Sequence, residues 1–124
     1  MIDFNQQSVF KLKQVPRNTF YSHVQPIMID DEQVISAYQT VRDGIVFTNY
    51  RIIALNLQGI AGKKVDITSL PYMNIQIFSV ENAGVADADA ELDLWFAGQK
   101  RIRFEFSGKS DVAIIGKIIS TFAL

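Results

Sequence analysis

The chain has 124 residues, 48% of them hydrophobic and 20% charged, which is the size and composition of one ordinary globular domain. Twelve basic residues stand against thirteen acidic ones, and the resulting net charge of -1 argues against bulk binding to nucleic acid. The absence of cysteine excludes disulfides and thiolate sites, and a single histidine leaves little for an imidazole metal centre. We expect no cofactor and no nucleic-acid partner.

The first residues show neither the basic segment nor the apolar segment of a secretory signal peptide. Charged and amide residues interrupt every apolar stretch before it reaches the roughly 18 residues that a membrane-spanning helix needs. The sequence therefore predicts a soluble, cytoplasmic protein, whose apolar residues fill short buried strands.

Residues 1–32 predict an N-terminal extension with little regular structure. Phe10–Lys13 alternates apolar and basic residues, which favours a short extended piece. Phe20, Val24 and Ile27 then recur at helical spacing before and after a proline. We expect a short helix over Asn18–Gln25.

Residues 33–107 have the short alternating pattern of β-strands. Asp43-Gly44 favours a type I′ hairpin turn, because glycine accepts a positive φ angle at little cost. Asn49-Tyr50 is the next turn, and Leu70-Pro71-Tyr72 interrupts a later strand because proline has no N–H to donate. Seven strands are predicted: Gln33–Arg42, Ile45–Thr48, Arg51–Leu57, Lys63–Ser69, Asn74–Val80, Glu91–Phe96 and Arg101–Phe106.

The last two predicted strands alternate most clearly and suggest their own register. Pairing that keeps both apolar sets on one face matches Phe96 with Ile102, Leu94 with Phe104 and Leu92 with Phe106. This register places Trp95 opposite Arg103 on the outer face, in reach of a cation–π contact. It also places Asp93 opposite Glu105, a mild repulsion.

Residues 110–123 change to helical spacing. Ser110 is a suitable N-cap, and Asp111 suits the positive end of the helix dipole. Seven antiparallel strands followed by one amphipathic helix predict a partly open small barrel that the helix caps. The apolar face of that helix contains Val112, Ile115, Ile119 and Phe122, widened by Ile114 and Ile118.

Five segments, taken together, resemble the bacterial pleckstrin-homology (PH) domain family. They are Val41–Arg51, Gln58–Lys64, Ser69–Tyr72, Phe78–Gly84 and Asp87–Leu92, in order along the last three quarters of the chain. The resemblance implies a single PH-like domain over residues 1–124, mainly β, with a seven-stranded barrel and a C-terminal helix. It also implies small bacterial proteins that self-assemble, in some members into rings, and it brings no catalytic residues.

Three patterns look like functional sites but have simpler explanations. Gly59–Lys64 has too short a glycine spacing for a phosphate-binding loop, and a strand follows it where that loop needs a helix. Asp87, Asp89 and Glu91 begin like a calcium loop but lack its later glycine and glutamate, so an acidic rim for a partner is the better interpretation. His23 has no second histidine, no cysteine and no clear serine–histidine arrangement to work with, so a surface or packing role is the better interpretation. We therefore predict no enzyme activity and no metal site.

The leading functional hypothesis is a non-enzymatic, self-associating scaffold or protein-interaction module. An outward tryptophan on a strand favours an interface, since aromatic anchors are enriched at interface cores. Trp95, Arg103 and Glu105 are the predicted self-association residues, with another copy of the chain or another protein as the partner. The competing interpretation is that the N-terminal segment covers Trp95 within one subunit.

The alternative hypothesis is peripheral binding to a membrane or an anionic lipid head group. Arg42, Arg51, Lys63 and Lys64 are the predicted contacts. Recognition of a polyanion needs several donors that converge on one pocket, and these bases are spread over separate loops and strand ends. The sequence therefore ranks this hypothesis second.

Overall fold

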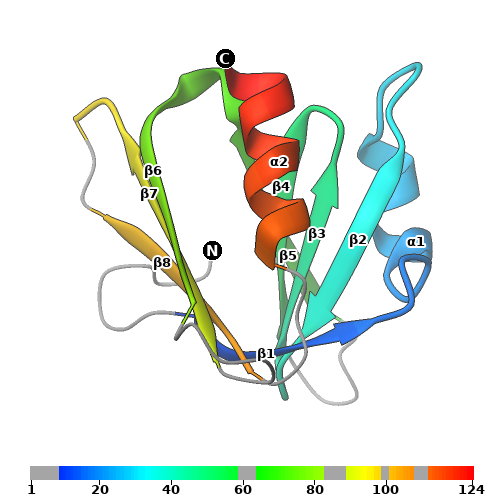
Figure 1. Cartoon of the computed structure of the whole chain (residues 1–124). Helices are drawn as coiled ribbons and strands as arrows, with labels where there is room; N and C mark the ends of the chain where they lie inside the picture. The colour runs from blue at the N-terminus through cyan, green and yellow to red at the C-terminus, as the bar shows by residue number, and fades with distance from the viewer. Residues whose placement is uncertain (1–8, 59–63, 83–88, 99–100, 108–111) are drawn as a thin grey trace. The chain divides into compact units, whose positions relative to one another are not determined.

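The computed structural model describes residues 9–58, 64–82, 89–98, 101–107 and 112–124, which are mostly β-structure (Figure 1). The described residues separate into two compact units, which are treated one at a time: a first unit of Gln14–Pro71, and a second unit of residues 9–13 with Tyr72–Leu124. Eight strands and a C-terminal helix are found within the described ranges, so the mainly β fold class is confirmed. None of the helices in these ranges is long and apolar enough to cross a bilayer.

The first unit begins with a short helical segment, as predicted, but with different bounds. Helix α1 spans Tyr21–Val24, and the 3-10 helix η1 spans Gln25–Ile27. The residues before α1 form a turn instead, because both the N–H and the hydroxyl of Thr19 donate to the carbonyl of Pro16. The helical spacing of the apolar residues reflects their burial, since Phe20 and Val24 lie in the core of this unit.

Four antiparallel strands form the sheet of the first unit. Their order is β5-β4-β3-β2, and each of the first four predicted strands corresponds to one of them. Their bounds are β2 Val34–Gln39, β3 Asp43–Thr48, β4 Arg51–Gln58 and β5 Lys64–Pro71. The apolar core beneath them is Phe20, Val24, Ala37, Val46, Ile53 and Leu55.

The turn between β2 and β3 differs from the predicted one. Gly44 is a strand residue opposite Gln39, and the chain reverses at Val41-Arg42, where the N–H of Thr40 donates to the carbonyl of Asp43. The predicted type I′ turn at Asp43-Gly44 is therefore wrong. Glycine is needed at this position for another reason, because a Cβ on Gly44 would lie 2.7 Å from the ring of Phe20.

The second unit has the strand order β1-β8-β7-β6. The strands β6, β7 and β8 are antiparallel neighbours and correspond to the last three predicted strands, whereas β1 is additional and pairs with β8 in parallel. The strand β1 contains the predicted extended piece Phe10–Lys13, and its Leu12 is fully buried. The bounds are β1 Val9–Val15, β6 Ile75–Asn82, β7 Ala90–Phe96 and β8 Ile102–Phe106, with the 3-10 helix η3 at Tyr72–Asn74.

The register of β7 and β8 is displaced by two residues from the predicted one. The observed pairs are Leu94 with Ile102, Asp93 with Arg103, Leu92 with Phe104, Glu91 with Glu105 and Ala90 with Phe106. Because side chains alternate with a period of two, a two-residue shift leaves every apolar residue on the buried face. On the outer face the observed register pairs Asp93 with Arg103 in an ion pair, and it places Glu91 instead of Asp93 opposite Glu105.

Helix α2, at Val112–Ala123, completes the second unit. Ile115, Ile118 and Ile119 are buried, as the helical pattern predicts. Ile114 and Phe122 are both nearly half exposed, so their predicted places on the buried face are wrong, although Phe122 stacks on the ring of Tyr72. The predicted cap at Ser110 and Asp111 lies outside the described residues.

Candidate functional site

The outward-facing side chains of β6, β7 and β8 form the candidate site of the second unit, and most of them are polar or charged. Leu92 and Leu94 point inward and are fully buried, so the alternate residues of β7 point outward. Cross-strand pairing arranges these outward residues in three consecutive rows: Ile77 with Trp95; Ser79 with Asp93 and Arg103; and Glu81 with Glu91 and Glu105.

Arg103 binds the carboxylate of Asp93 in a two-pronged contact. Its Nε donates to Oδ1 of Asp93 over 2.8 Å, and its Nη2 donates to Oδ2 over 3.1 Å. A second carboxylate, that of Glu91, lies 3.4 Å from Nη1. The hydrogen bonds to Asp93, followed by the charges of Asp93 and Glu91, raise the pKa of Arg103. Arg103 is therefore held in place by acidic residues of its own unit.

Three glutamates lie directly across from one another in the next row. The pKa of Glu91, the central one, is raised above its ordinary value. Partial burial contributes most to this shift, Arg103 opposes it, and the negative charges of Glu81 and Glu105 add to it. Among the described residues, one arginine shared between Glu91 and Asp93 does not compensate the three glutamates, so the described part of this end carries surplus negative charge.

Apolar side chains occupy the opposite end of the same face. Trp95 is half-buried and pairs with Ile77, which is 60% exposed. The predicted position of Trp95 opposite Arg103 is therefore wrong, because the shifted register pairs Arg103 with Asp93. The three predicted self-association residues do share one face, in successive rows, while Ile77 was missed because the strand pattern does not show its neighbour across the sheet.

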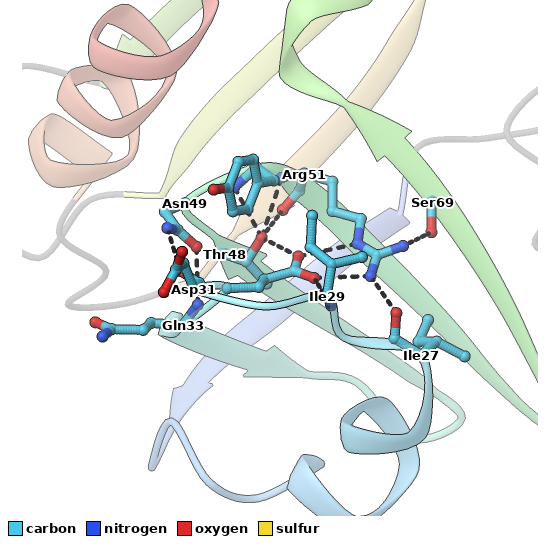
Figure 2. A network of polar contacts seen from close by, with 10 residues as sticks. Ile27, Ile29, Asp31, Gln33, Thr48, Asn49, Arg51 and Ser69 are labelled. Carbon is cyan, nitrogen blue, oxygen red and sulfur yellow. Dashed lines mark hydrogen bonds and ion pairs between the residues drawn. The ribbon is translucent and has the colours of Figure 1, made fainter.

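A network of hydrogen bonds around a buried carboxylate joins four segments of the first unit (Figure 2). The Nε of Arg51 donates to Oε2 of Glu32 over 2.9 Å, and its Nη2 donates to Oε1 over 2.8 Å. The hydroxyl of Thr48 donates to the same carboxylate, and the N–H of Ile29 does so as well. Arg51 also donates to the carbonyl of Ile27 and to the hydroxyl of Ser69, so one guanidinium links η1, β4 and β5.

The environment of Glu32 favours its charged form. Burial by itself would raise the pKa of Glu32, but the hydrogen bonds from Arg51, Thr48 and Ile29 outweigh it, and the pKa is lowered. Glu32 is one of the residues that line an open cavity of about 540 Å³, together with Arg17, Tyr21 and Met28. Since the side chain of Glu32 is fully buried and paired, it offers the cavity no free acid or base.

The structure separates Arg51 from Arg42 and Lys64, the other described bases that were predicted to contact an anion. Arg51 lies at the first residue of β4 and is bound to Glu32. Arg42 and Lys64 lie at the other end of the same sheet, where the N–H of Leu57 donates to the carbonyl of Arg42 and Gln58 pairs with Lys64. The strand between the two ends is about 25 Å long at roughly 3.3 Å per residue, and Lys63 lies outside the described residues.

Other patterns from the sequence gain no supporting geometry. Asp87 and most of Gly59–Lys64 lie outside the described residues. His23 is half-buried in α1. Within the described ranges, no three histidine, aspartate or glutamate side chains gather closely enough to hold a metal ion.

Residues 3–123 match the family model of the bacterial PH domain. The uncharacterized protein YjqA of Bacillus subtilis strain 168 is 40% identical to the chain over 100 residues, which cover 79% of this chain and 80% of YjqA. A crystal structure of a DUF1696 family protein with a pleckstrin-homology domain, from Shewanella loihica PV-4, is 43% identical with a TM-score of 0.73, over 93% of this chain and 99% of that one. The pleckstrin-homology domain of Shewanella amazonensis SB2B is 42% identical with a TM-score of 0.65, over 89% and 90%.

Proposed function

The chain belongs to the bacterial PH domain family, and from this membership we propose that it is a non-enzymatic, self-associating scaffold or protein-interaction module. One observation carries the proposal: Ile77 is 60% exposed beside Trp95 on an otherwise polar strand face. An exposed aliphatic side chain next to an aromatic one is the composition of an interface core, with charged residues forming its rim.

The charges on this face also suit a second copy. Arg101 lies 3.9 Å from Asp93 with half of its side chain exposed, so its attraction to that carboxylate is weak. Glu81 and Glu105 lie on the same face, in the row next to that of Asp93. A copy turned around a two-fold axis would bring its arginines toward these glutamates, because such an interface joins one patch to itself in reverse.

Size-exclusion chromatography with light scattering tests the proposal. We expect assemblies larger than a monomer at micromolar concentration, and Ile77→Lys is expected to reduce them. Val41→Lys is the matched control, since Val41 is 95% exposed in the turn between β2 and β3 of the first unit. Trp95 is the only tryptophan, so its fluorescence shift on dilution reports whether this face is involved. A strictly monomeric wild-type protein would overturn the proposal.

Binding to anionic lipid is the second candidate, supported by the exposed pair Arg42 and Lys64 at one end of the first unit. Co-sedimentation with phosphatidylglycerol vesicles at low and high salt tests it, because screening weakens electrostatic binding. Arg42→Glu with Lys64→Glu is expected to abolish binding, whereas phosphatidylcholine vesicles serve as the uncharged control. No sedimentation at low salt excludes this candidate.

A further inference from the structure

The strand β6 pairs with one neighbour only among the described residues, and that neighbour is β7. Its other side therefore presents backbone N–H and C=O groups that a further strand could pair with. The register between β6 and β7 is irregular between Ile75 and Ile77 and then regular from Ile77 to Asn82. The regular part offers a template of six residues.

This edge has few of the features that protect sheet edges from other strands. Proline and lysine are common protections, and β5, the last strand of the sheet in the first unit, has Lys64 at one end and Pro71 at the other. The strand β6 contains neither, and its single charged residue is Glu81. Two of its aliphatic side chains, Ile77 at 60% and Val80 at 38%, are exposed on opposite faces of the strand.

Helix α2 borders the inner side of this edge. It runs in the opposite direction to β6 in the second unit, with Phe122 stacked on Tyr72 before the strand begins and Gly116 beside Val80 near its end (Figure 1). A Cβ on Gly116 would lie 3.3 Å from Val80, so the glycine lets the helix approach closely. A strand added to β6 would thus meet apolar side chains on its inner side.

We propose that the β6 edge binds an extended segment of a partner protein as an added strand. The main-chain groups of Ile77–Asn82 supply the pairing. Alternate apolar residues of the segment pack on the inner side beside Val80, and a residue of its other face lies beside Ile77. The row of Glu81, Glu91 and Glu105 sets the charge of the segment, because a lysine or arginine beside Glu81 would pair with that carboxylate and be attracted at longer range by Glu91 and Glu105 on the next two strands. The partner segment therefore has apolar residues at alternate positions and one basic residue on its opposite face.

Amide hydrogen exchange on the full chain tests this proposal. The probe is a short synthetic peptide of alternating valine and threonine with one lysine, capped at both ends. In an antiparallel pair only every second residue of β6 bonds to β7, so the other amides between Ile77 and Asn82 exchange quickly in the free protein. The peptide is expected to slow this fast set by about tenfold or more and to leave the amides of β5 unchanged.

Two substitutions check the chemistry of the site. Val80→Lys is expected to remove the protection, and Glu81→Gln is expected to weaken binding of the lysine peptide more than binding of a peptide with glutamine at that position. Asp30→Asn, an exposed carboxylate of the first unit, is the matched control for charge. No protection of β6 at peptide concentrations up to about 1 mM would overturn the proposal.

The same measurement separates this proposal from self-association. Protection of the fast amides that rises with protein concentration, without any peptide, would show a second copy on the edge and would contradict a partner segment. Protection by the peptide in a monomeric variant such as Trp95→Ser, which alters the proposed self-association face on β7 and leaves the β6 edge unchanged, would support the edge site even where self-association fails.

Discussion

Glu32 is a carboxylate whose burial is compensated residue by residue. Arg51, Thr48 and Ile29 each donate a hydrogen bond to it, and Arg51 adds the opposite charge. Removing one member of a buried pair leaves the other without compensation, which costs far more than losing an exposed ion pair. Substitution of a residue in this network is therefore expected to reduce stability more than substitution of an exposed charged residue.

Glu32→Gln is expected to lower the free energy of unfolding by about 2–3 kcal/mol at pH 7, because it leaves Arg51 without its counter-charge. The loss depends on pH. The pKa of Glu32 is lowered in the folded chain, so its contribution is fully present above its unfolded value near 4.5 and is lost as the pH falls through the folded value. Urea unfolding from pH 7 to pH 3 should show the two proteins converging in acid, and Asp30→Asn should match the wild type. An equal gap at every pH would contradict this account.

The contribution of Glu91 to stability is expected to depend on pH with the opposite sign to that of Glu32. Its pKa is raised in the folded chain, so the stability linked to its proton is present below about pH 4.5 and is lost as the pH rises toward the folded value. Glu91→Gln should therefore raise stability at pH 7, by about 0.5 kcal/mol because the site is partly exposed and Arg103 offsets part of the repulsion. Thermal unfolding of Glu91→Gln and of Glu32→Gln at pH 7 compares the expected gain and the expected loss of stability for the same type of substitution. Destabilisation by Glu91→Gln would mean that its contact with Arg103 outweighs the glutamate row.

Gly44 is a third single residue with an expected effect on stability. The sequence suggests a glycine for a turn, whereas the structure requires it because the ring of Phe20 lies close to the backbone. Gly44→Ala is expected to cost about 1–3 kcal/mol, since its Cβ would overlap the ring of Phe20. Phe20→Leu should cost less in the Gly44→Ala background than in the wild type, because the smaller side chain relieves the overlap. Denaturation of the two single variants and the double variant measures this coupling, and additive losses would rule it out.

Among the elements, the positions of strands were far easier to predict than their pairing. Turn residues and short apolar runs place β2 to β8 close to their observed bounds, and a buried residue at every second position marks β7 and β8 most clearly. That pattern has a period of two, so it cannot distinguish registers that differ by two residues. The contacts of Trp95 and Arg103 followed from the register, and the error therefore passed directly into the candidate site.

Long-range polar contacts left no local pattern at all. Glu32 and Arg51 are separated by 19 positions, and nothing between them indicates that the two side chains meet. The sequence consequently offered Arg51 as a free base, whereas the structure shows it bound. Exposed bases at the ends of strands can be predicted from composition, but their partners depend on how the turns bring the strands together.

Cysteine cross-linking can check the register of β7 and β8 directly, because the chain has no cysteine of its own. Asp93→Cys with Arg103→Cys places two thiols on directly opposed residues, within the range that a disulfide spans. We expect this pair to oxidise readily and Trp95→Cys with Arg103→Cys to oxidise slowly. Mass spectrometry under mild oxidation gives both rates. Faster oxidation of the second pair would restore the register predicted from the sequence.

For the whole molecule, near-neutral charge hides an uneven distribution. The net charge is -1 over the full chain, yet within the described ranges the row of Glu81, Glu91 and Glu105 is paired with a single arginine, Arg103, which also binds Asp93. If the outer face of β6 to β8 joins copies of the chain, as proposed, each copy brings Arg101 toward three glutamates of the other, so the described carboxylates outnumber the arginines at the contact and a net repulsion remains at neutral pH. Protonation should relieve the repulsion, beginning with Glu91 because its pKa is raised.

Association is therefore expected to strengthen as the pH falls from 7 toward 5, and Glu105→Gln should shift the pH 7 distribution toward larger species. Proteins also associate generally near their isoelectric point, here about 5.7, so net charge alone could imitate this trend. Asp30→Asn separates the two causes, because it changes the net charge by the same amount on the first unit. Light scattering of both variants across this pH range gives the comparison: equal shifts would assign the effect to net charge, and a larger shift for Glu105→Gln assigns it to the glutamate row.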